Sequence, residues 1–521
     1  MWLTVVVADV VSSLVSGTIA PGRIVSGRRA AVPRVRRRKF GNMAEDVPVP
    51  GAGKAGTVVV VAVTSMAGFI AFLDSTIVNI AFPSIRADFS SWSLDSLSWV
   101  MNIYNIVFAA LLVPAGRYAD RFGRKMLFVA GLVVFAATSL LCALAPTAGL
   151  LVVFRGFQAL GAALIVPAAL ALLLPAFPEA RRGVAVSLFA ATAALAAGIG
   201  PALGGFLIDI SDWRLVFAVN VPIGLLTVVA ALLWLTEARD SGATANPDGV
   251  AIVCSAGGFG LLALGIVKGN DWGWTDWRTI GALGAGIVLV LWVIQRCRTH
   301  PAPLIEARIL ADRTIASASV STFVFAAAFY AYLLANVLFL TSVWHYSTLR
   351  AGLAMTPAPL FSTLAARPAG ALYDRFGGRW VAVTGAVLVA AGLLCYALLA
   401  GADPDFLLGW LPGAIVSGIG VGMVWPSLAT ASVQGVTGTR FATATAFNGA
   451  LRQLGGVLGV AACVSFLTAR GGSDPLGSFH LIWIAGGIVC VAAGIAASSL
   501  RRPLPVDPAE VSVPAEAPVR P

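Results

Sequence analysis

Long apolar runs separated by short polar segments make up most of this 521-residue chain. A helix crosses the hydrocarbon core of a bilayer with about 20 mostly apolar residues. Fourteen runs meet that length, which predicts an all-α polytopic membrane protein with 14 transmembrane helices. The predicted spans are 57–82, 97–116, 126–145, 149–174, 183–208, 214–236, 249–267, 279–296, 314–341, 350–372, 380–400, 406–430, 441–468 and 479–500.

Composition agrees with this pattern, since 58% of the residues are hydrophobic and only 11% are charged. A soluble domain averages about 25% charged residues. The net charge of +11 does not indicate nucleic-acid binding, because 26 of the 35 Lys and Arg residues lie in the tails and in the loops of one side. Such residues face the cytoplasm. An even number of spans then places both termini there, in a multi-pass protein of the cytoplasmic membrane.

The two tails differ from the spans. Residues 1–56 form a basic N-terminal segment, expected in the cytoplasm. Asp9 interrupts its apolar part, and the arginines follow that part, which is the reverse of a secretory signal. We expect translation to begin at Met43, with residues 1–42 a mis-assigned start; a disordered tail and a fifteenth span are the alternatives. Residues 501–521 are rich in proline and are predicted to be a disordered cytoplasmic tail.

An internal repeat divides the spans. The segment Gly116–Lys125 follows the second span, and Gly370–Arg379 follows the tenth, with Gly, Asp, Arg, Phe and Gly recurring in register 254 residues later. Two copies of a six-span unit with two inserted spans explain this spacing, which predicts a 6+2+6 arrangement. The predicted units are an N-terminal bundle (57–236), a two-helix insert with flanking loops (237–313) and a C-terminal bundle (314–500). Parallel repeats of this kind build facilitator-type transporters.

The repeated loops are candidates for a conformational switch. Glycine permits a tight turn, an aspartate can cap a helix, and arginines can bind carbonyl oxygens or a carboxylate. Such contacts can hold one conformation and break in another. A turn combined with positive-inside anchoring is the simpler interpretation. The candidate residues are Gly116, Asp120, Arg121, Gly123, Arg124, Asp374 and Arg375.

One carboxylate lies inside a span. Asp74 interrupts the first apolar run, and an acid near the bilayer centre costs about 2.5–3.5 kcal/mol. We therefore interpret Asp74 as a proton-coupling group, for which a proton and a cationic drug could compete. Arg155 is a permanent charge inside the fourth span, so it must face the bundle interior and find a partner. A purely structural ion pair is the alternative for Arg155.

Four segments together resemble the major facilitator superfamily, specifically its fourteen-span drug:proton antiporter branch of the EmrB/QacA type. They are Leu73–Pro83, Gly116–Lys125, Arg155–Gly161 and Gly198–Gly205. The resemblance covers residues 57–500. It implies a role in proton transfer for Arg155, and a pliable fifth helix that seals against proton leak. Tight packing alone is the alternative for that helix, whose motif residues are Gly198, Gly200, Pro201, Gly204 and Gly205.

The expected function is proton-coupled export of hydrophobic or amphipathic drugs or antibiotics. An uptake symporter of the same fold and a non-transporting membrane sensor are the alternatives. Six scattered cysteines and three histidines show no metal-ligand spacing, and no phosphate-binding loop or nucleophile–base pair is visible. The chain is therefore expected to be no enzyme and to need no cofactor or metal. The expected partners are the drug, protons and the lipid bilayer, without nucleic acid; substrate-binding residues are not assigned.

Overall fold

The computed structural model describes residues 54–177, 182–237, 248–300, 303, 312–434, 440–469 and 475–500. The expected start at Met43 and the predicted disorder of residues 501–521 lie outside these ranges. Every regular element in the described residues is helical. The main helices are α2 (Lys54–Asp88), α4 (Trp99–Phe122), α5 (Arg124–Ala143), α6 (Ala148–Leu173), α7 (Arg182–Ile210), α9 (Asn220–Trp234), α10 (Gly249–Trp272), α11 (Trp277–Thr299), α13 (Arg313–Ser342), α15 (Pro357–Phe376), α16 (Gly378–Leu399), α17 (Leu411–Ala431), α18 (Arg440–Ala469) and α19 (Pro475–Ala497).

Short helices join or precede several of these. They are α3 (Leu94–Leu97), η1 (Leu174–Ala176), α8 (Leu215–Ala218), α14 (Thr348–Met355) and η3 (Phe406–Trp410). Polar side chains fix several helix starts: Thr147 caps α6, and Asp312 accepts hydrogen bonds from the first amides of α13. Such caps satisfy amide groups that have no partner inside the helix.

Twelve helical segments of the described residues are long and apolar enough to cross a membrane. The prediction of an all-α polytopic membrane protein is confirmed at that level. Two of the fourteen predicted spans are not among the twelve. The span at 183–208 corresponds to α7, one continuous helix of 29 residues whose side chains are described without gaps only from Ile199 onward. The span at 350–372 is divided into α14 and α15, because Pro357 lacks an amide hydrogen and begins a new helix.

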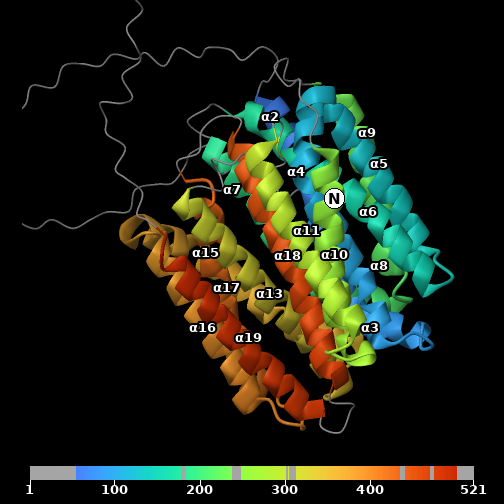
Figure 1. The fold of residues 1–521 in the computed structure, drawn as a ribbon. Coiled ribbons are helices and arrows are strands. Elements are labelled where there is room, and N and C mark those ends of the chain that lie inside the picture. Colours follow the sequence, from blue (N-terminus) through green and yellow to red (C-terminus); the bar gives the residue numbers. More distant parts are fainter. Residues whose placement is uncertain are drawn as a thin grey trace, which may run out of the picture.

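The helices form two packed groups, which meet along two extended contacts. In the first group, α6 packs on α4 and α5, and α2 packs on α7. In the second, α16 packs on α17 and α19, and α13 packs on α18 and α19. The groups meet mainly where α4 lies against α18 and where α7 lies against α14. Figure 1 shows the second group, in dark yellow, orange and red, beside the first, in blue and green.

The pair α10 and α11 lies outside both groups. The two helices pack on each other, and α10 also packs on α4 and α18. Asn270 of α10 donates to Ser465 Oγ (3.1 Å) and Thr468 Oγ1 (2.9 Å) of α18. At the opposite end Asp248 caps α10 and pairs with Arg296 of α11, whose hydrogen bond lowers the pKa of Asp248. Polar contacts at both ends therefore hold a pair whose faces are otherwise apolar.

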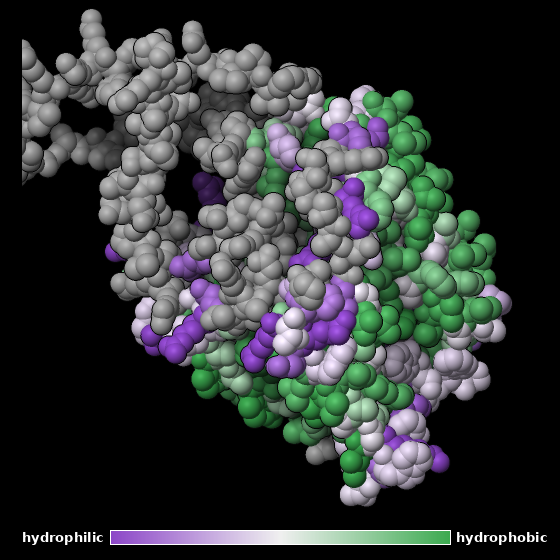
Figure 2. Space-filling model, turned by 45° about the horizontal axis from the view of Figure 1, so that its top comes forward, coloured by the Kyte–Doolittle hydropathy of each residue, from purple (hydrophilic) through white to green (hydrophobic). Residues whose placement is uncertain are grey.

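The surface of the molecule suits a bilayer. Figure 2 shows hydrophobic residues over the flank and hydrophilic residues toward the ends. Large apolar side chains are exposed on both helix groups and on the α10–α11 pair. Examples are Leu226 of α9 (72% exposed), Val253 of α10 (71%) and Ile488 of α19 (67%). A soluble protein rarely exposes so many large apolar residues together. The flank is therefore a lipid-facing surface.

Candidate functional site

Asp74 lies near the middle of α2 and is fully buried. Its Oδ2 is 2.5 Å from Nη1 of Arg155 on α6, which is also buried. The structure thus brings together the two charged residues that the sequence places inside spans of the first bundle. Removing two charges from water is costly unless each finds a partner of opposite charge and further hydrogen bonds.

Three amide and hydroxyl groups complete the surroundings of the Asp74 carboxylate. Its Oδ1 accepts hydrogen bonds from Nε2 of Gln158 (2.8 Å) and from Nδ2 of Asn220 (3.1 Å). Gln158 also donates to Ser139 Oγ at 2.7 Å. Four helices, α2, α5, α6 and α9, therefore contribute to one polar cluster. Sequence reasoning missed Gln158, Asn220 and Ser139 as partners, although polar residues within apolar spans are the signal that could have found them.

Arg155 is held from several directions at once. Its Nε donates to the carbonyl of Val100 (3.1 Å), and Nη1 also donates to Gln158 Oε1 (2.6 Å). Its guanidinium carbon lies 4.2 Å from the centre of the Tyr104 ring, within cation–π range. Val100 and Tyr104 belong to α4, so Arg155 joins α4 to the carboxylate on α2. A change in the charge of Asp74 would therefore change the contacts that Arg155 makes with α4.

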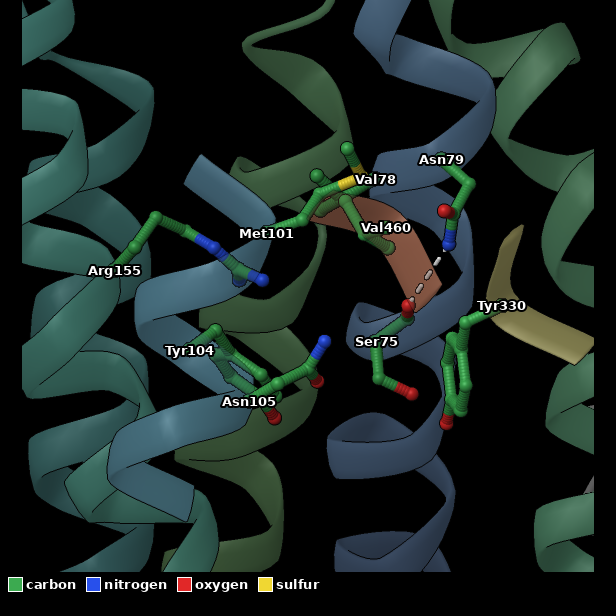
Figure 3. Close-up of a pocket in the computed structure, with 9 residues that line it drawn as sticks. All are labelled: Ser75, Val78, Asn79, Met101, Tyr104, Asn105, Arg155, Tyr330 and Val460. Carbon is green, nitrogen blue, oxygen red and sulfur yellow. Dashed lines mark hydrogen bonds between the residues drawn. The ribbon is translucent and has the colours of Figure 1, made fainter. Parts of the chain in front are cut away.

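A small pocket lies beside this cluster, at the junction of the two helix groups. Figure 3 shows Arg155, Tyr104 and Asn105 reaching toward it from the first group, and Tyr330 from the second. The lining residues are Ser75, Val78, Asn79, Met101, Tyr104, Asn105, Arg155, Tyr330 and Val460. Its free space is enough for about one water molecule. A drug-sized molecule would enter only if the groups moved apart.

A chain of hydrogen bonds crosses the junction at this pocket. Tyr330 of α13 donates to Gln453 Oε1 of α18 at 3.1 Å, and Gln453 Nε2 donates to Asn105 Oδ1 of α4 at 3.3 Å. Asn105 follows Tyr104, the residue on which Arg155 stacks. The second helix group is thus linked through α4 to the ion pair.

The two repeated loops share one backbone conformation. Gly123 (φ +124°) ends α4 and begins α5, and Gly377 (φ +87°) ends α15 and begins α16. Glycine adopts this left-handed region at little cost. Gly116 lies within α4, and Arg121 and Arg375 lie over Phe122 and Phe376. The side chains of Asp120 and Asp374 lie outside the described part of the structure.

An acid that the sequence did not single out holds the first of these loops. Glu237, just after α9, accepts hydrogen bonds from the amides of Lys125 (3.0 Å) and Met126 (3.1 Å) at the start of α5. Lys125 Nζ in turn donates to the carbonyls of Leu232 and Leu235 at the end of α9. Arg124 donates to the carbonyl of Ala171 on α6. A carboxylate at a helix N-terminus and an ammonium group at a C-terminus both complement the helix dipoles.

The glycine motif of α7 has two faces. Gly200 and Gly204 face Thr76, Ile77 and Ile80 of α2, so they pack α7 within the first group. Gly205 faces the backbone of Thr348 and Leu349, and Gly352 of α14 contacts the carbonyl of Pro201. This second face joins α7 to the second group. The surroundings of Gly198 lie outside the described part of the structure.

Comparisons with known proteins agree with the architecture. A family model described as Major Facilitator Superfamily matches residues 64–295 and 318–521. A probable actinorhodin transporter of Streptomyces coelicolor is 34% identical over 75% of this chain and 68% of its own length. The tetracenomycin C resistance and export protein of Streptomyces glaucescens is 31% identical (77% and 74%), and multidrug resistance protein Stp of Mycobacterium tuberculosis is 30% identical (78% and 75%).

Among solved structures, a POT family transporter in complex with a thioalcohol-conjugated peptide superimposes with a TM-score of 0.61. The alignment covers 85% of this chain and 95% of that protein at 16% identity, so the likeness concerns the fold. The residues matched by the family model include both repeated loops and the segments around Asp74 and Arg155. The chain therefore belongs to the Major Facilitator Superfamily, in its EmrB/QacA-type branch, and is a transporter and not an enzyme.

Proposed function

We propose that this protein exports a hydrophobic or amphipathic antibiotic or drug from the cytoplasm in exchange for protons. The observation that carries the proposal is the buried Asp74–Arg155 pair beside a pocket between the two helix groups. The relatives named for actinorhodin transport, tetracenomycin export and multidrug resistance support the substrate class.

Asp74 would be the proton carrier. When ionised, Asp74 is paired with Arg155. When a proton binds, the charge attraction is lost, whereas the contacts of Arg155 with the Val100 carbonyl, Gln158 and the rings of Tyr104 and Phe217 remain. Because Arg155 lines the pocket and contacts α4, this change would alter both the pocket and the packing of α4. Proton binding at Asp74 and substrate binding at the pocket would thereby favour different conformations.

The arrangement proposed for this transport is fourteen spans in a 6+2+6 order, with both termini in the cytoplasm. The matching turns at Gly123 and Gly377 support a duplicated unit. The position of α10 and α11 beside α4 and α18 supports an inserted pair. In this scheme α7 and the combined α14 and α15 are the two further spans.

The test of coupling is transport into proteoliposomes under an imposed pH gradient. A dye panel in a host that lacks its own efflux pumps first identifies an exported dye. That dye should accumulate in vesicles with an acidic lumen and not when the outside is acidic, which is the direction of exchange. Accumulation under the opposite gradient would indicate symport and overturn the proposal.

Asp74→Asn should abolish gradient-driven accumulation while the protein still inserts and purifies as a single species. The neutral amide retains the size of the side chain but cannot carry a proton. Asp88→Asn is a matched control, because Asp88 is the last residue of the same helix. Its side chain is partly exposed and pairs with Arg214, away from the buried pair. Accumulation by Asp74→Asn at the level of the control would exclude Asp74 as the proton carrier.

A further inference from the structure

We infer that the substrate carries an acidic group, and that Arg452 of α18 binds this group while nearby aromatic rings bind its apolar body. The inference deepens the proposed function, because it names the charge of the exported compound. It rests on that function only for the direction of transport; binding can be measured without a gradient.

The first observation is the balance of charge inside the described helices. Charged residues that lie well away from both ends of their helix are one acid, Asp74, and three arginines, Arg155, Arg367 and Arg452. Arg367 is exposed, so the charges inside the described helices are those of Asp74, Arg155 and Arg452. Arg367 was not singled out from the sequence. The carboxylate of Asp74 is already bound by Arg155, Gln158 and Asn220. A cationic ligand would have to displace Arg155, whereas an anionic ligand would meet an excess of positive charge.

The second observation is the state of Arg452. It lies in the middle of α18, and it makes no hydrogen bond or ion pair with any residue in the described ranges. Its Nε is buried and unpaired there. A buried donor on a charged side chain without a partner costs free energy. A carboxylate or phenolate would supply the missing acceptor, and an arginine can bind a carboxylate through two parallel hydrogen bonds.

The third observation is what surrounds this guanidinium. Its central carbon lies 5.9 Å from the ring centre of Phe72 on α2 and 5.6 Å from that of Trp425 on α17. Trp425 packs edge-on against Phe325 (4.9 Å) and Phe329 (5.7 Å) of α13. Arg452 and Phe72 come from opposite helix groups, so the cation faces the junction and not lipid. An aromatic wall with one cation fits a flat, aromatic acid.

The position is next to the pocket already described. Gln453, the neighbour of Arg452, is bonded to Tyr330, which lines that pocket. Phe72 belongs to α2, the helix of the first group that also carries Asp74. An anion bound at Arg452 would therefore lie between the two groups, beside the rings of Phe72 and Trp425. Its negative charge would leave with the substrate when the junction reopens.

The experiment uses two dyes on one scaffold with opposite charge, fluorescein (anionic) and rhodamine 123 (cationic). Binding to the purified full-length protein is measured by fluorescence anisotropy at neutral pH without a gradient. We expect the protein to bind fluorescein more tightly than rhodamine 123. Arg452→Gln should weaken fluorescein binding by about tenfold to a hundredfold and leave rhodamine 123 binding unchanged or tighter. Arg452→Lys, which keeps the charge, should retain part of the affinity.

Two results would overturn the inference. One is tighter binding of rhodamine 123 than of fluorescein by the unaltered protein. The other is an equal loss of both dyes in Arg452→Gln when its thermal unfolding matches that of the unaltered protein. If Arg452→Gln unfolds at a lower temperature, dye binding is compared between Arg452→Lys, which keeps the charge, and Arg452→Met, which removes it. Equal fluorescein binding by these two variants would also overturn the inference. Failure of proton exchange would appear separately, as fluorescein binding without gradient-driven accumulation.

Discussion

At the scale of single residues, the site is a charge pair whose members depend on each other. Arg155 supplies the charge that balances Asp74, and it also contacts Val100, Gln158 and the Tyr104 ring. Lysine is a point charge and cannot make these directional contacts together. The site therefore requires arginine for its geometry and not only for its charge.

Removal of one charge should destabilise the protein more than removal of both. Arg155→Gln leaves the Asp74 carboxylate buried without its counter-ion, a change that costs about 3–5 kcal/mol. In the double variant Asp74→Asn with Arg155→Gln, no unpaired charge remains, so most of that loss should be recovered. Thermal unfolding in detergent measures both. Equal destabilisation by the single and double variants would contradict the pairing.

Gly123 is a second residue whose identity the backbone dictates. A methyl group at this position would lie 2.8 Å from the Glu237 carboxylate, and φ is +124°. Gly123→Ala should therefore lose about 1–2 kcal/mol through backbone strain alone and release Glu237 from the start of α5. Gly284→Ala is the control, since no atom lies within 4 Å of the added methyl group. Transport should fall much more than dye binding; a parallel fall in both would point to misfolding.

At the scale of elements, α7 packs against one helix of each group. Its Gly200 and Gly204 face α2 within the first group, whereas Pro201 and Gly205 meet α14 of the second group. The spacing of small residues permits close approach of helices on both sides. The helix motif thus serves internal packing and the junction at once.

Gly352→Ala should open the seam between α7 and α14. The added methyl group would meet the Pro201 carbonyl, a backbone atom that cannot rotate away. Overpacking costs about 1–3 kcal/mol. This cost destabilises only the conformation in which α7 and α14 are in contact. Ser211 follows the end of α7, and Ser342 ends α13 of the second group. In a background without native cysteines, the distance between spin labels at Ser211→Cys and Ser342→Cys should increase, and transport should decrease. Gly260→Ala, in open space, is the control; unchanged distances in Gly352→Ala would contradict the seam.

At the scale of the whole molecule, the two groups of helices meet where α4 packs on α18 and where α7 packs on α14. The pair α10 and α11 lies beside the first of these contacts. Motion of the groups against each other is the general way in which such repeats give alternating access. The pair α10 and α11 contributes no described residue to the pocket lining. The pair is bonded to α18 through Asn270 and also packs on α4, so it contacts both groups at one side of their junction.

The proposed orientation is tested with two exposed tryptophans near helix starts. Trp277 begins α11 and is 76% exposed, and Trp380 near the start of α16 is 53% exposed. In a background without native cysteines, Trp277→Cys should react with a membrane-impermeant thiol reagent added to whole cells. Trp380→Cys should react only after the cells are opened. The reverse pattern would place the termini outside.

The sequence by itself determined the class of fold, because its continuous apolar runs have the length at which a helix spans the bilayer and pairs all of its own backbone groups. It also determined the family and singled out Asp74 and Arg155, since charged residues are rare within spans. Only the tertiary structure decided what these residues touch. Gln158, Asn220 and Glu237 are distant in sequence from their partners, and hydrogen bonds between helices follow from how the helices pack. The unpaired state of Arg452 likewise depends on which side chains the fold places around it.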